Sequence, residues 1–348
     1  MRTANGSWSR VWCSLIAVGM GLAGGWTGRA QDGLPAKAGV SGVQRPMTAL
    51  VPSAVFPVAG HPDWMAVTPD GLWVTSSSAD HVVRLNARTN QVDRVVTVSR
   101  PCSGLATGFG GLWIPSCGGH MLVEVDAITG KPWREVTVTP ADSEGGITTG
   151  AGSVWMVSAA EDAPPAHAGK RQPVPEKVVL DRIDPVKGVV VARIPLPDGS
   201  YNPFFAAGMV WVTSNRGNAL VRVDPKTNRV AGSIPTGRMP RFLTYGAGSV
   251  WTLNQGDGTI TRVDAKTGRV MATIAAGIPG LGGEITFGDG AAWATVFGFP
   301  ITRIDAGTNR VTAQWTGAGG DSIRVAHGSV WLSYLMGAKV VRIPVPES

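Results

Sequence analysis

The sequence predicts an all-β fold, a seven-bladed β-propeller of four-stranded antiparallel blades. Tryptophans recur along the 348-residue chain at a nearly constant spacing, with one longer gap after Trp155. Four short alternating runs, separated by turn residues, fit into each interval. A period near 40 is typical of one supersecondary unit that buries its apolar face only against its neighbours. We expect these tryptophans to pack between blades: Trp73, Trp113, Trp155, Trp211, Trp251, Trp293 and Trp331.

The repeat around Trp251 shows the four expected strands most clearly. Runs at 241–245, 249–253, 259–264 and 269–274 alternate in polarity and are separated by Gly, Asn, Asp and Thr-Gly signals, as in an antiparallel meander. The corner between the last two runs has the form Asp-x-x-Thr followed by Gly or Asn. Asp accepts backbone N–H bonds in such a corner, and Gly or Asn takes the left-handed position. The corner recurs at Asp126, Asp224, Asp264 and Asp305, and it begins with Asn86 in the first repeat.

The two ends of the repeat region indicate how the ring closes. The runs that follow Trp331 end near Pro344, which leaves the last blade without its outer strand. An extra strand-like run, residues 54–58, precedes the first repeat. We expect this N-terminal run to supply the missing strand and so to remove an exposed sheet edge.

The residues before the repeats divide into two segments. Arg2 and Arg10 precede a short apolar run at 11–25, and small residues surround Ala30, which together predict a signal peptide over 1–30. The apolar run is too short for a stable membrane anchor, so we expect no membrane span and a periplasmic or secreted protein cleaved near Ala30. Residues 31–52 are rich in Gly, Pro, Ala and Ser and are expected to form a flexible leader. The propeller then occupies residues 53–348.

The charge of the chain argues against a nucleic-acid partner. The formal net charge is +7, and it falls to +4 once Arg2, Arg10 and Arg29 leave with the signal peptide, because 28 basic residues then face 24 acidic ones. The basic residues form no block, whereas a nucleic-acid interface needs a clustered basic face.

Two cysteines remain after export, Cys102 and Cys117. They flank the first two strands of one blade, so the turn at 109–112 places them nearly opposite each other. We expect a disulfide closing a loop of about 15 residues, worth roughly 3 kcal/mol in the chain-entropy model. Two buried free thiols are the alternative.

The repeats resemble those of known propellers. The stretch from Val210 to Asn215 and on through residues 221–228 is similar to YVTN-type repeats and to the repeats of virginiamycin B (streptogramin) lyases, and the likeness extends over 53–344. The resemblance implies the propeller fold, but these superfamilies contain lyases, lactone hydrolases, quinoproteins and plain binding modules. The lyases carry a Glu three residues after the strand tryptophan. This chain has none at any of the seven positions, and no His-x-His or Glu-x-His pair supports a His-based general base.

One polar residue per blade is expected at the mouth of the central channel. Counting back nine to eleven residues from each tryptophan reaches the start of the innermost strand. These residues are either solvated loop positions or a small-molecule or cation site, since a propeller concentrates buried polarity there. We call the following set the mouth residues: Asp63, Ser103, Glu144, Asn202, Arg241, Glu284 and Asp321.

Four of the mouth residues carry oxygen atoms that suit Ca²⁺ or Mg²⁺, namely Glu144, Asn202, Glu284 and Asp321. A similar carboxylate and amide set occurs in gluconolactonase and regucalcin-like propellers, where a divalent ion polarises a lactone carbonyl. The resemblance therefore implies a site for a divalent metal ion.

An insertion interrupts the third repeat. The stretch from Trp155 to Asp184 is more than twice as long as the corresponding stretch in the other repeats, and the surplus lies at 160–177. It falls on the same face as the mouth residues. Long loops of this kind are often functional, so it is either a lid or partner contact, or a neutral surface insertion.

These observations predict an exported propeller that binds a small molecule or a protein partner on the face that carries the mouth residues and the insertion. The alternative is a divalent-metal-dependent lyase or lactone hydrolase resembling streptogramin lyases or gluconolactonases. A third hypothesis is a scaffold in a secreted or cell-surface assembly.

Overall fold

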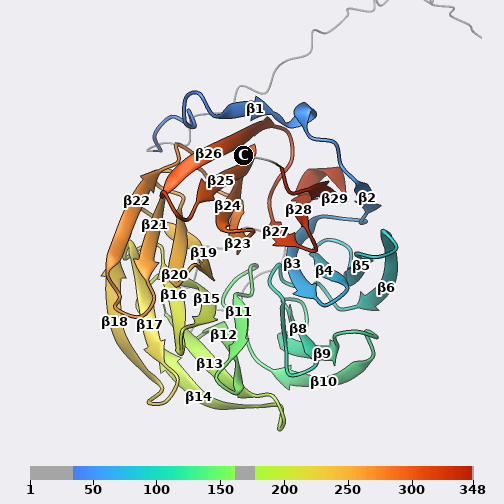
Figure 1. Ribbon diagram of the computed structural model, residues 1–348. Helices are drawn as coiled ribbons and strands as arrows, with labels where there is room; N and C mark the ends of the chain where they lie inside the picture. The colour runs from blue at the N-terminus through green and yellow to red at the C-terminus, as the bar shows by residue number, and fades with distance from the viewer. Residues whose placement is uncertain (1–33, 161–176, 347–348) are drawn as a thin grey trace, which may run out of the picture. The chain divides into compact units, whose positions relative to one another are not determined.

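The computed structural model describes residues 34–160 and 177–346, and these residues form seven sheets in a ring, each with four antiparallel strands (Figure 1). The predicted seven-bladed propeller is confirmed. The first strands of neighbouring blades contact one another around the whole ring, so they line the central channel. The expected signal peptide, residues 1–30, lies outside the described residues. No helix within the described part is long and apolar enough to cross a membrane.

Each blade runs outward from the channel in chain order. Blades one to three contain β3 (Pro62–Thr68), β4 (Gly71–Ser76), β5 (His81–Asn86), β6 (Gln91–Thr97); β7 (Ala106–Gly108), β8 (Gly111–Ser116), β9 (Met121–Asp126), β10 (Pro132–Thr137); and β11 (Ile147–Gly150), β12 (Ser153–Ala159), β13 (Val178–Asp184), β14 (Val189–Pro195). Blades four to six contain β15 (Ser200–Ala206), β16 (Met209–Ser214), β17 (Ala219–Asp224), β18 (Arg229–Pro235); β19 (Pro240–Gly246), β20 (Ser249–Asn254), β21 (Thr259–Asp264), β22 (Val270–Ala275); and β23 (Glu284–Gly288), β24 (Ala291–Val296), β25 (Gly298–Asp305), β26 (Arg310–Gly317).

Blade seven closes the ring with strands from both ends of the propeller. Its own strands are β27 (Ile323–Ala326), β28 (Ser329–Tyr334) and β29 (Lys339–Pro344), with a short 3-10 turn η2 (Leu335–Gly337) between the last two. The N-terminal strand β2 (Ala54–Pro57) pairs antiparallel with β29 and supplies the outer strand, as predicted. Phe56 of β2 is buried, and its ring centroid lies 5.4 Å from that of Trp331.

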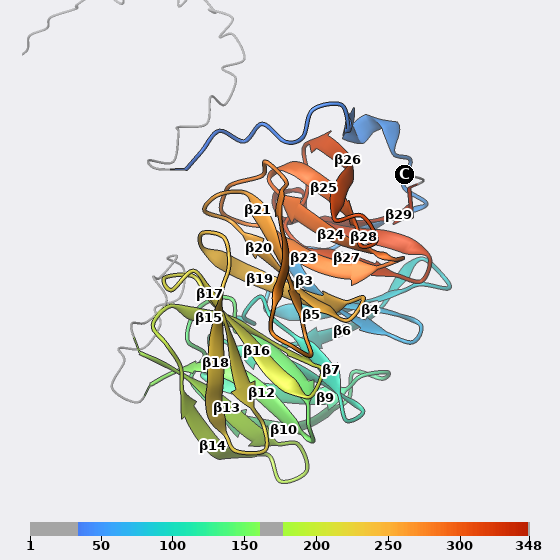
Figure 2. The same ribbon diagram turned by 60° about the vertical axis from the view of Figure 1, so that its left-hand side comes forward.

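The expected flexible leader is partly wrong. Strand β1 (Gln44–Pro46) pairs parallel with β26 as a fifth strand of blade six, and the 3-10 turn η1 (Met47–Ala49) follows it. The backbone N–H of Val40 donates to Gln314 Oε1 at 2.6 Å. Figure 1 and Figure 2 both show this blue segment along the outer edge of β26. Short-range pattern does not reveal such a strand, because its partner lies near the opposite end of the chain.

The seven periodic tryptophans form the core between blades, as predicted. Each is fully buried. Six indole Nε1 atoms donate to the backbone carbonyl five residues earlier, at the end of the first strand of the same blade. The exception is Trp73, whose Nε1 donates 2.8 Å to the carbonyl of Ala127 in the next blade. The rings therefore combine a large buried apolar area with a satisfied polar atom.

An arginine opposite the tryptophan ties one blade to the next. Arg342 on β29 pairs with Trp331 on β28, and its guanidinium carbon lies 5.1 Å from the indole centroid. Its Nε donates 2.9 Å to Ser329 Oγ. Its Nη1 donates to the carbonyl of Ala87 at 2.6 Å and to Asn90 Oδ1 at 2.9 Å, both in the outer corner of blade one. We call this arrangement the Trp–Arg clamp.

The same clamp joins two other pairs of blades. It links blade three to blade four and blade five to blade six, and in every case the accepting Asn occupies the left-handed position of the corner, with φ near 55°. The corner Asn thus satisfies a backbone requirement and accepts a hydrogen bond. The further clamps consist of Trp155, Arg182, Pro225 and Asn228, and of Trp251, Arg262, Ala306 and Asn309.

Removing β2 should damage the fold far more than removing β1. Deletion of residues 31–50 removes a three-residue exposed strand, so we expect a modest loss of stability. Deletion of residues 31–60 also removes Phe56 and opens the last blade, so cooperative unfolding should be lost. Urea unfolding of both truncated proteins tests this, and equal stability of the two would refute closure by β2.

Replacing a clamp arginine should destabilise the ring without touching the channel. Arg342→Met removes the hydrogen bonds of the guanidinium and its indole contact, so we expect a loss of about 3 kcal/mol in unfolding free energy. Arg229→Met, on an exposed outer strand, is the control and should stay close to the wild type. The clamp has no energetic role if chemical denaturation gives the same midpoint for both variants.

Candidate functional site

The mouth residues lie where the first strands of the blades begin, at one end of the channel. Four belong to strands: Asp63 in β3, Asn202 in β15, Arg241 in β19 and Glu284 at the start of β23. The other three precede a strand by two or three residues, namely Ser103 before β7, Glu144 before β11 and Asp321 before β27.

Two of the mouth carboxyl groups form a pair. Asp63 and Asp321 come from blades one and seven, which are neighbours in the closed ring, and Asp321 has the largest charge effect on Asp63. The N–H of Gly283 donates 3.2 Å to Asp321 Oδ1. Burial, and then the charges of Asp321 and Glu144, raise the pKa of Asp63 well above its usual value. Folding therefore favours the protonated form of Asp63.

Arg241 is the cation that faces these acids. Its Nη2 lies 3.2 Å from Glu144 Oε1, and its guanidinium carbon lies 4.2 Å from the ring centroid of Tyr201. The same Nη2 contacts the Tyr201 hydroxyl. The backbone carbonyl of Arg241 accepts bonds from Asn202 Nδ2 at 2.9 Å and from Thr213 Oγ1 at 3.0 Å. Side chain and backbone are therefore both held in place.

Asp142 is a further acid at the mouth. It is buried, and its Oδ1 accepts the backbone N–H groups of Glu144 at 2.9 Å and Gly145 at 3.3 Å. Burial, followed by the charge of Glu144, raises the pKa of Asp142 to about 7, although Arg241 and the two backbone bonds act in the opposite direction. Asp142 is therefore partly protonated near neutral pH.

Glu284 belongs to a separate ion pair. Its Oε1 lies 2.5 Å from Arg324 Nη1, and its Oε2 accepts bonds from the Ser322 hydroxyl and from the N–H of Ile323. Burial raises the pKa of Glu284, and the charge of Arg324 is the largest opposing effect. Both carboxylate oxygens are engaged.

The predicted Ca²⁺ or Mg²⁺ ligand set does not fit this arrangement. Glu284 already has a cation, Arg324, as its partner, and Glu144 faces Arg241. Within residues 34–160 and 177–346, no three His, Cys, Asp or Glu residues are grouped closely enough to hold a metal ion.

A cavity of about 310 Å³ lies in the channel next to the mouth residues. Asp63, Tyr201 and Arg241 each directly precede a residue that lines it. The lining residues that follow them in the chain are Trp64, Asn202 and Phe242, respectively. The rings of Trp64 and Phe242 lie 6.0 Å apart, and Tyr201 meets Phe242 edge-on at 6.4 Å. The cavity therefore has an aromatic wall directly below the acids.

Asn202, which lines the cavity, has one polar atom without a partner. Asn202 is 1% exposed, and its Oδ1 accepts no hydrogen bond, although its Nδ2 is bonded to the Arg241 carbonyl. A buried acceptor left unsatisfied costs about 1–3 kcal/mol.

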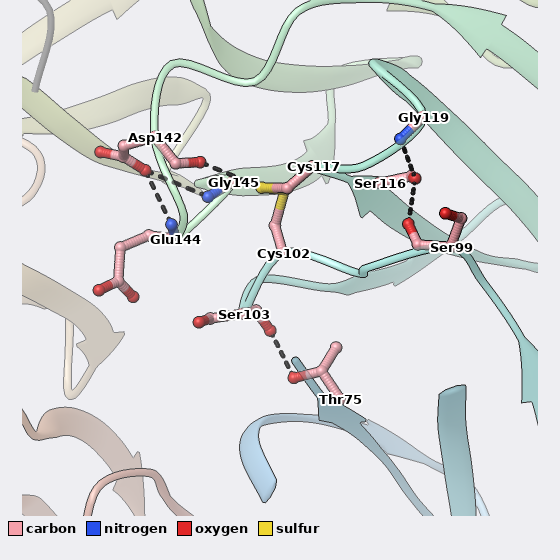
Figure 3. Close-up of a disulfide and its surroundings, with 10 residues drawn as sticks. All are labelled: Thr75, Ser99, Cys102, Ser103, Ser116, Cys117, Gly119, Asp142, Glu144 and Gly145. Atoms are coloured by element: carbon pink, nitrogen blue, oxygen red, sulfur yellow. Dashed lines mark hydrogen bonds between the residues drawn. A yellow bond between two sulfur atoms is a disulfide. The ribbon is translucent and has the colours of Figure 1, made fainter. Parts of the chain in front are cut away.

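The structure contains the predicted Cys102–Cys117 disulfide, with the Cα atoms 5.1 Å apart. It lies against the loop that carries Asp142 and Glu144. Cys117 Sγ is 3.4 Å from the Asp142 carbonyl, and the N–H of Gly104 donates 2.5 Å to the Glu144 carbonyl. Figure 3 shows the side chains of Ser103 and Glu144 pointing to the same side, away from the disulfide. The bridge therefore positions two mouth residues.

The predicted insertion over 160–177 lies almost entirely outside the described residues. Its two ends are described, and the N–H of Ala160 donates 3.2 Å to the carbonyl of Lys177. These ends continue β12 and β13, so the insertion leaves the connection between the second and third strands of blade three, as expected.

Sequence reasoning missed several residues of the site. Asp142 could have been found from its position two residues before Glu144, and Tyr201 from its position next to Asn202. Arg324 gave no comparable signal, because its pairing with Glu284 joins two different blades. Trp64 and Phe242 could not be distinguished from other apolar residues in strands.

The comparisons with known proteins support the fold. A solved structure of streptogramin B lyase superposes with a TM-score of 0.62 and 18% sequence identity, over 82% of this chain and 94% of that one. The chain has a streptogramin lyase-like propeller fold. No family model matches the sequence, and no curated protein matches it. At this level of identity the likeness concerns the fold alone.

Asp142 should make the folded protein less stable as pH rises. Its pKa rises from 3.8 to about 7 on folding, so the folded state binds more protons between these values. The stabilisation is complete below pH 4 and is lost as pH rises through 7. Asp142→Asn keeps the Oδ1 acceptor, so we expect a gain over wild type that grows from pH 4 to pH 8, up to about 4 kcal/mol. Urea unfolding across this range tests it.

The control for this measurement is Asp289→Asn, which changes an exposed acid in a turn of blade six. It should show no pH-dependent gain. A flat difference between Asp142→Asn and wild type would mean that Asp142 is ionised in the folded protein throughout this range.

Proposed function

We propose that this protein binds a small organic molecule in its central channel, entering through the face that carries the mouth residues. The observation that carries the proposal is the cavity of about 310 Å³ in the channel, whose lining includes the buried side chain of Asn202. Cavities of this size, with apolar walls and a few oriented polar groups, are typical small-molecule sites. The Cys102–Cys117 disulfide supports export to an oxidising compartment.

Filling the cavity should abolish this binding. Ala106 lines the cavity at the start of β7, so Ala106→Leu projects a larger side chain into it. The matched control is Ala231→Leu on the exposed strand β18. A melting-temperature screen against a small-molecule library should yield compounds that stabilise wild type and the control but not Ala106→Leu. Compounds that stabilise all three proteins equally bind elsewhere and count against the channel.

A divalent-metal-dependent lyase or lactone hydrolase is the second candidate. The fold likeness to streptogramin B lyase and the acids at the mouth favour it, whereas the engagement of Glu284 by Arg324 opposes it. A metal that binds only the folded state raises stability with concentration. Melting in Ca²⁺, Mg²⁺ and EDTA therefore separates the two candidates, and a rise that EDTA reverses would favour the metal-dependent enzyme.

A further inference from the structure

One ion pair lines the cavity. Glu284 and Arg324 are the charged side chains among the described residues of its wall. Arg324 Nη1 lies 2.5 Å from Glu284 Oε1 and also donates 2.7 Å to the carbonyl of Ile323. The side chain of Glu284 is 5% exposed, and its second oxygen accepts bonds from Ser322 Oγ and from the N–H of Ile323. The two charges therefore balance each other, and Glu284 has little capacity left for a ligand.

Arg324 retains hydrogen-bond donors that the protein does not use. Its Nη1 serves Glu284 and the Ile323 carbonyl, whereas Nε and Nη2 find no acceptor among the described residues. The guanidinium is planar, so the contacts that fix Nη1 also fix the direction of the remaining N–H groups. The side chain is 17% exposed, so a molecule in the cavity can reach it. An oxygen atom placed against the Nε–Nη2 edge would accept two hydrogen bonds.

The threonine hydroxyl groups of the wall already have partners. Thr148 Oγ1 accepts the backbone N–H of Phe205 at 3.1 Å. Thr149 Oγ1 donates 2.7 Å to the carbonyl of Thr107, and Thr107 Oγ1 donates 3.3 Å to a backbone carbonyl of blade one. Hydrogen bonds from an ionised donor are stronger than those from a neutral one. Arg324 therefore carries the strongest donors that the wall offers to a ligand.

The balanced ion pair favours a ligand without net charge. An ion that leaves water for a buried site needs a counter-charge, and the cation and the anion of this wall already neutralise each other. An uncharged oxygen acceptor gains charge-assisted hydrogen bonds from the guanidinium and brings no unbalanced charge. The apolar part of such a ligand fits beside the rings of Trp64 and Phe242.

We propose that the ligand is an uncharged carbonyl compound with an apolar body, and that Arg324 recognises its carbonyl oxygen. This oxygen accepts hydrogen bonds from Nε and Nη2, while Glu284 and the Ile323 carbonyl hold the guanidinium in place. The apolar body lies against Trp64 and Phe242. The inference names the ligand class of the channel site and so rests on the proposed function.

Three probes that share a phenylpropyl body isolate the polar head. The amide 3-phenylpropanamide presents an uncharged carbonyl, the anion 3-phenylpropanoate presents a charged carboxylate, and the cation 3-phenylpropylamine presents no acceptor. Titration calorimetry at pH 7.5 should show the amide binding at least about tenfold more tightly than either ion. Tighter binding of the anion would mean that Arg324 selects a negative charge, which would overturn the inference.

Replacing the ion pair as a unit tests the role of Arg324. Glu284→Gln combined with Arg324→Met removes both charges, so no unpaired charge stays buried, and a melting curve checks that the variant folds. The amide should lose about tenfold in affinity and bind no more tightly than the ions. The matched control combines Glu124→Gln with Arg134→Met. It removes another pair of a buried acid and a partly exposed arginine, on the outer strands of blade two, and should bind all probes as wild type does.

A second variant covers the case in which the double variant does not fold. Arg324→Lys keeps the ion pair with Glu284 but lacks the planar Nε–Nη2 edge. It should therefore also lower the affinity for the amide while leaving the affinities for the two ions unchanged.

The outcomes separate this inference from the proposed function. If all three probes bind equally and Ala106→Leu abolishes their binding, the channel binds small molecules but does not select a carbonyl group. An amide preference that survives the loss of the Arg324 guanidinium also overturns the inference. If no probe binds, the inference fails, and the proposed function then depends on the library screen with Ala106→Leu.

Discussion

Blade-to-blade packing around buried tryptophans is the constraint on which this structure depends. A single four-stranded blade cannot bury its own apolar face, so each tryptophan is buried only because a neighbouring blade covers it. The Trp–Arg clamp adds directional contacts between neighbouring blades, since Arg342 stacks on Trp331 and donates a hydrogen bond to the outer corner of blade one. Where the corner ends in Gly instead of Asn, other groups make the junction. Trp73 bonds to Ala127, and Arg134 donates to the Val186 carbonyl.

The rigidity of this ring is what permits a charged channel mouth. Carboxyl groups that are close together and partly buried repel one another, and a loose scaffold would relieve the repulsion by moving them apart. Here Asp63 and Arg241 each lie at a β-bulge near the start of a strand that is otherwise paired with its neighbour. The sheets thus hold like charges together, and burial together with these charges raises the pKa values of Asp63 and Asp142.

The fold was largely predictable from sequence because its signals are local and periodic. The tryptophan interval, the Asp and Asn corners, the closing strand at 54–57 and the cysteine pair each depend on residues close together or on one regular count. The features that the sequence did not reveal are contacts between segments that lie far apart in the chain or in different blades. The partner of β1 belongs to the sixth blade, and the pairing of Glu284 with Arg324 depends on which blades are adjacent. The position of each mouth residue could be counted from its tryptophan, but its partners could not.

The disulfide is a local feature of the sequence that supports contacts between two neighbouring blades. The loop at 142–145 carries two acids that repel each other, and Asp142 is further disfavoured as an anion by its burial. Backbone bonds from Ser103 and Gly104 hold this loop against the strand that begins blade two, and the Cys102–Cys117 bridge fixes the chain that makes those bonds. The bridge therefore offsets an electrostatic cost that arises one blade away. A stabilising cross-link next to buried acids that repel each other is expected where a functional site, rather than the fold, requires those acids.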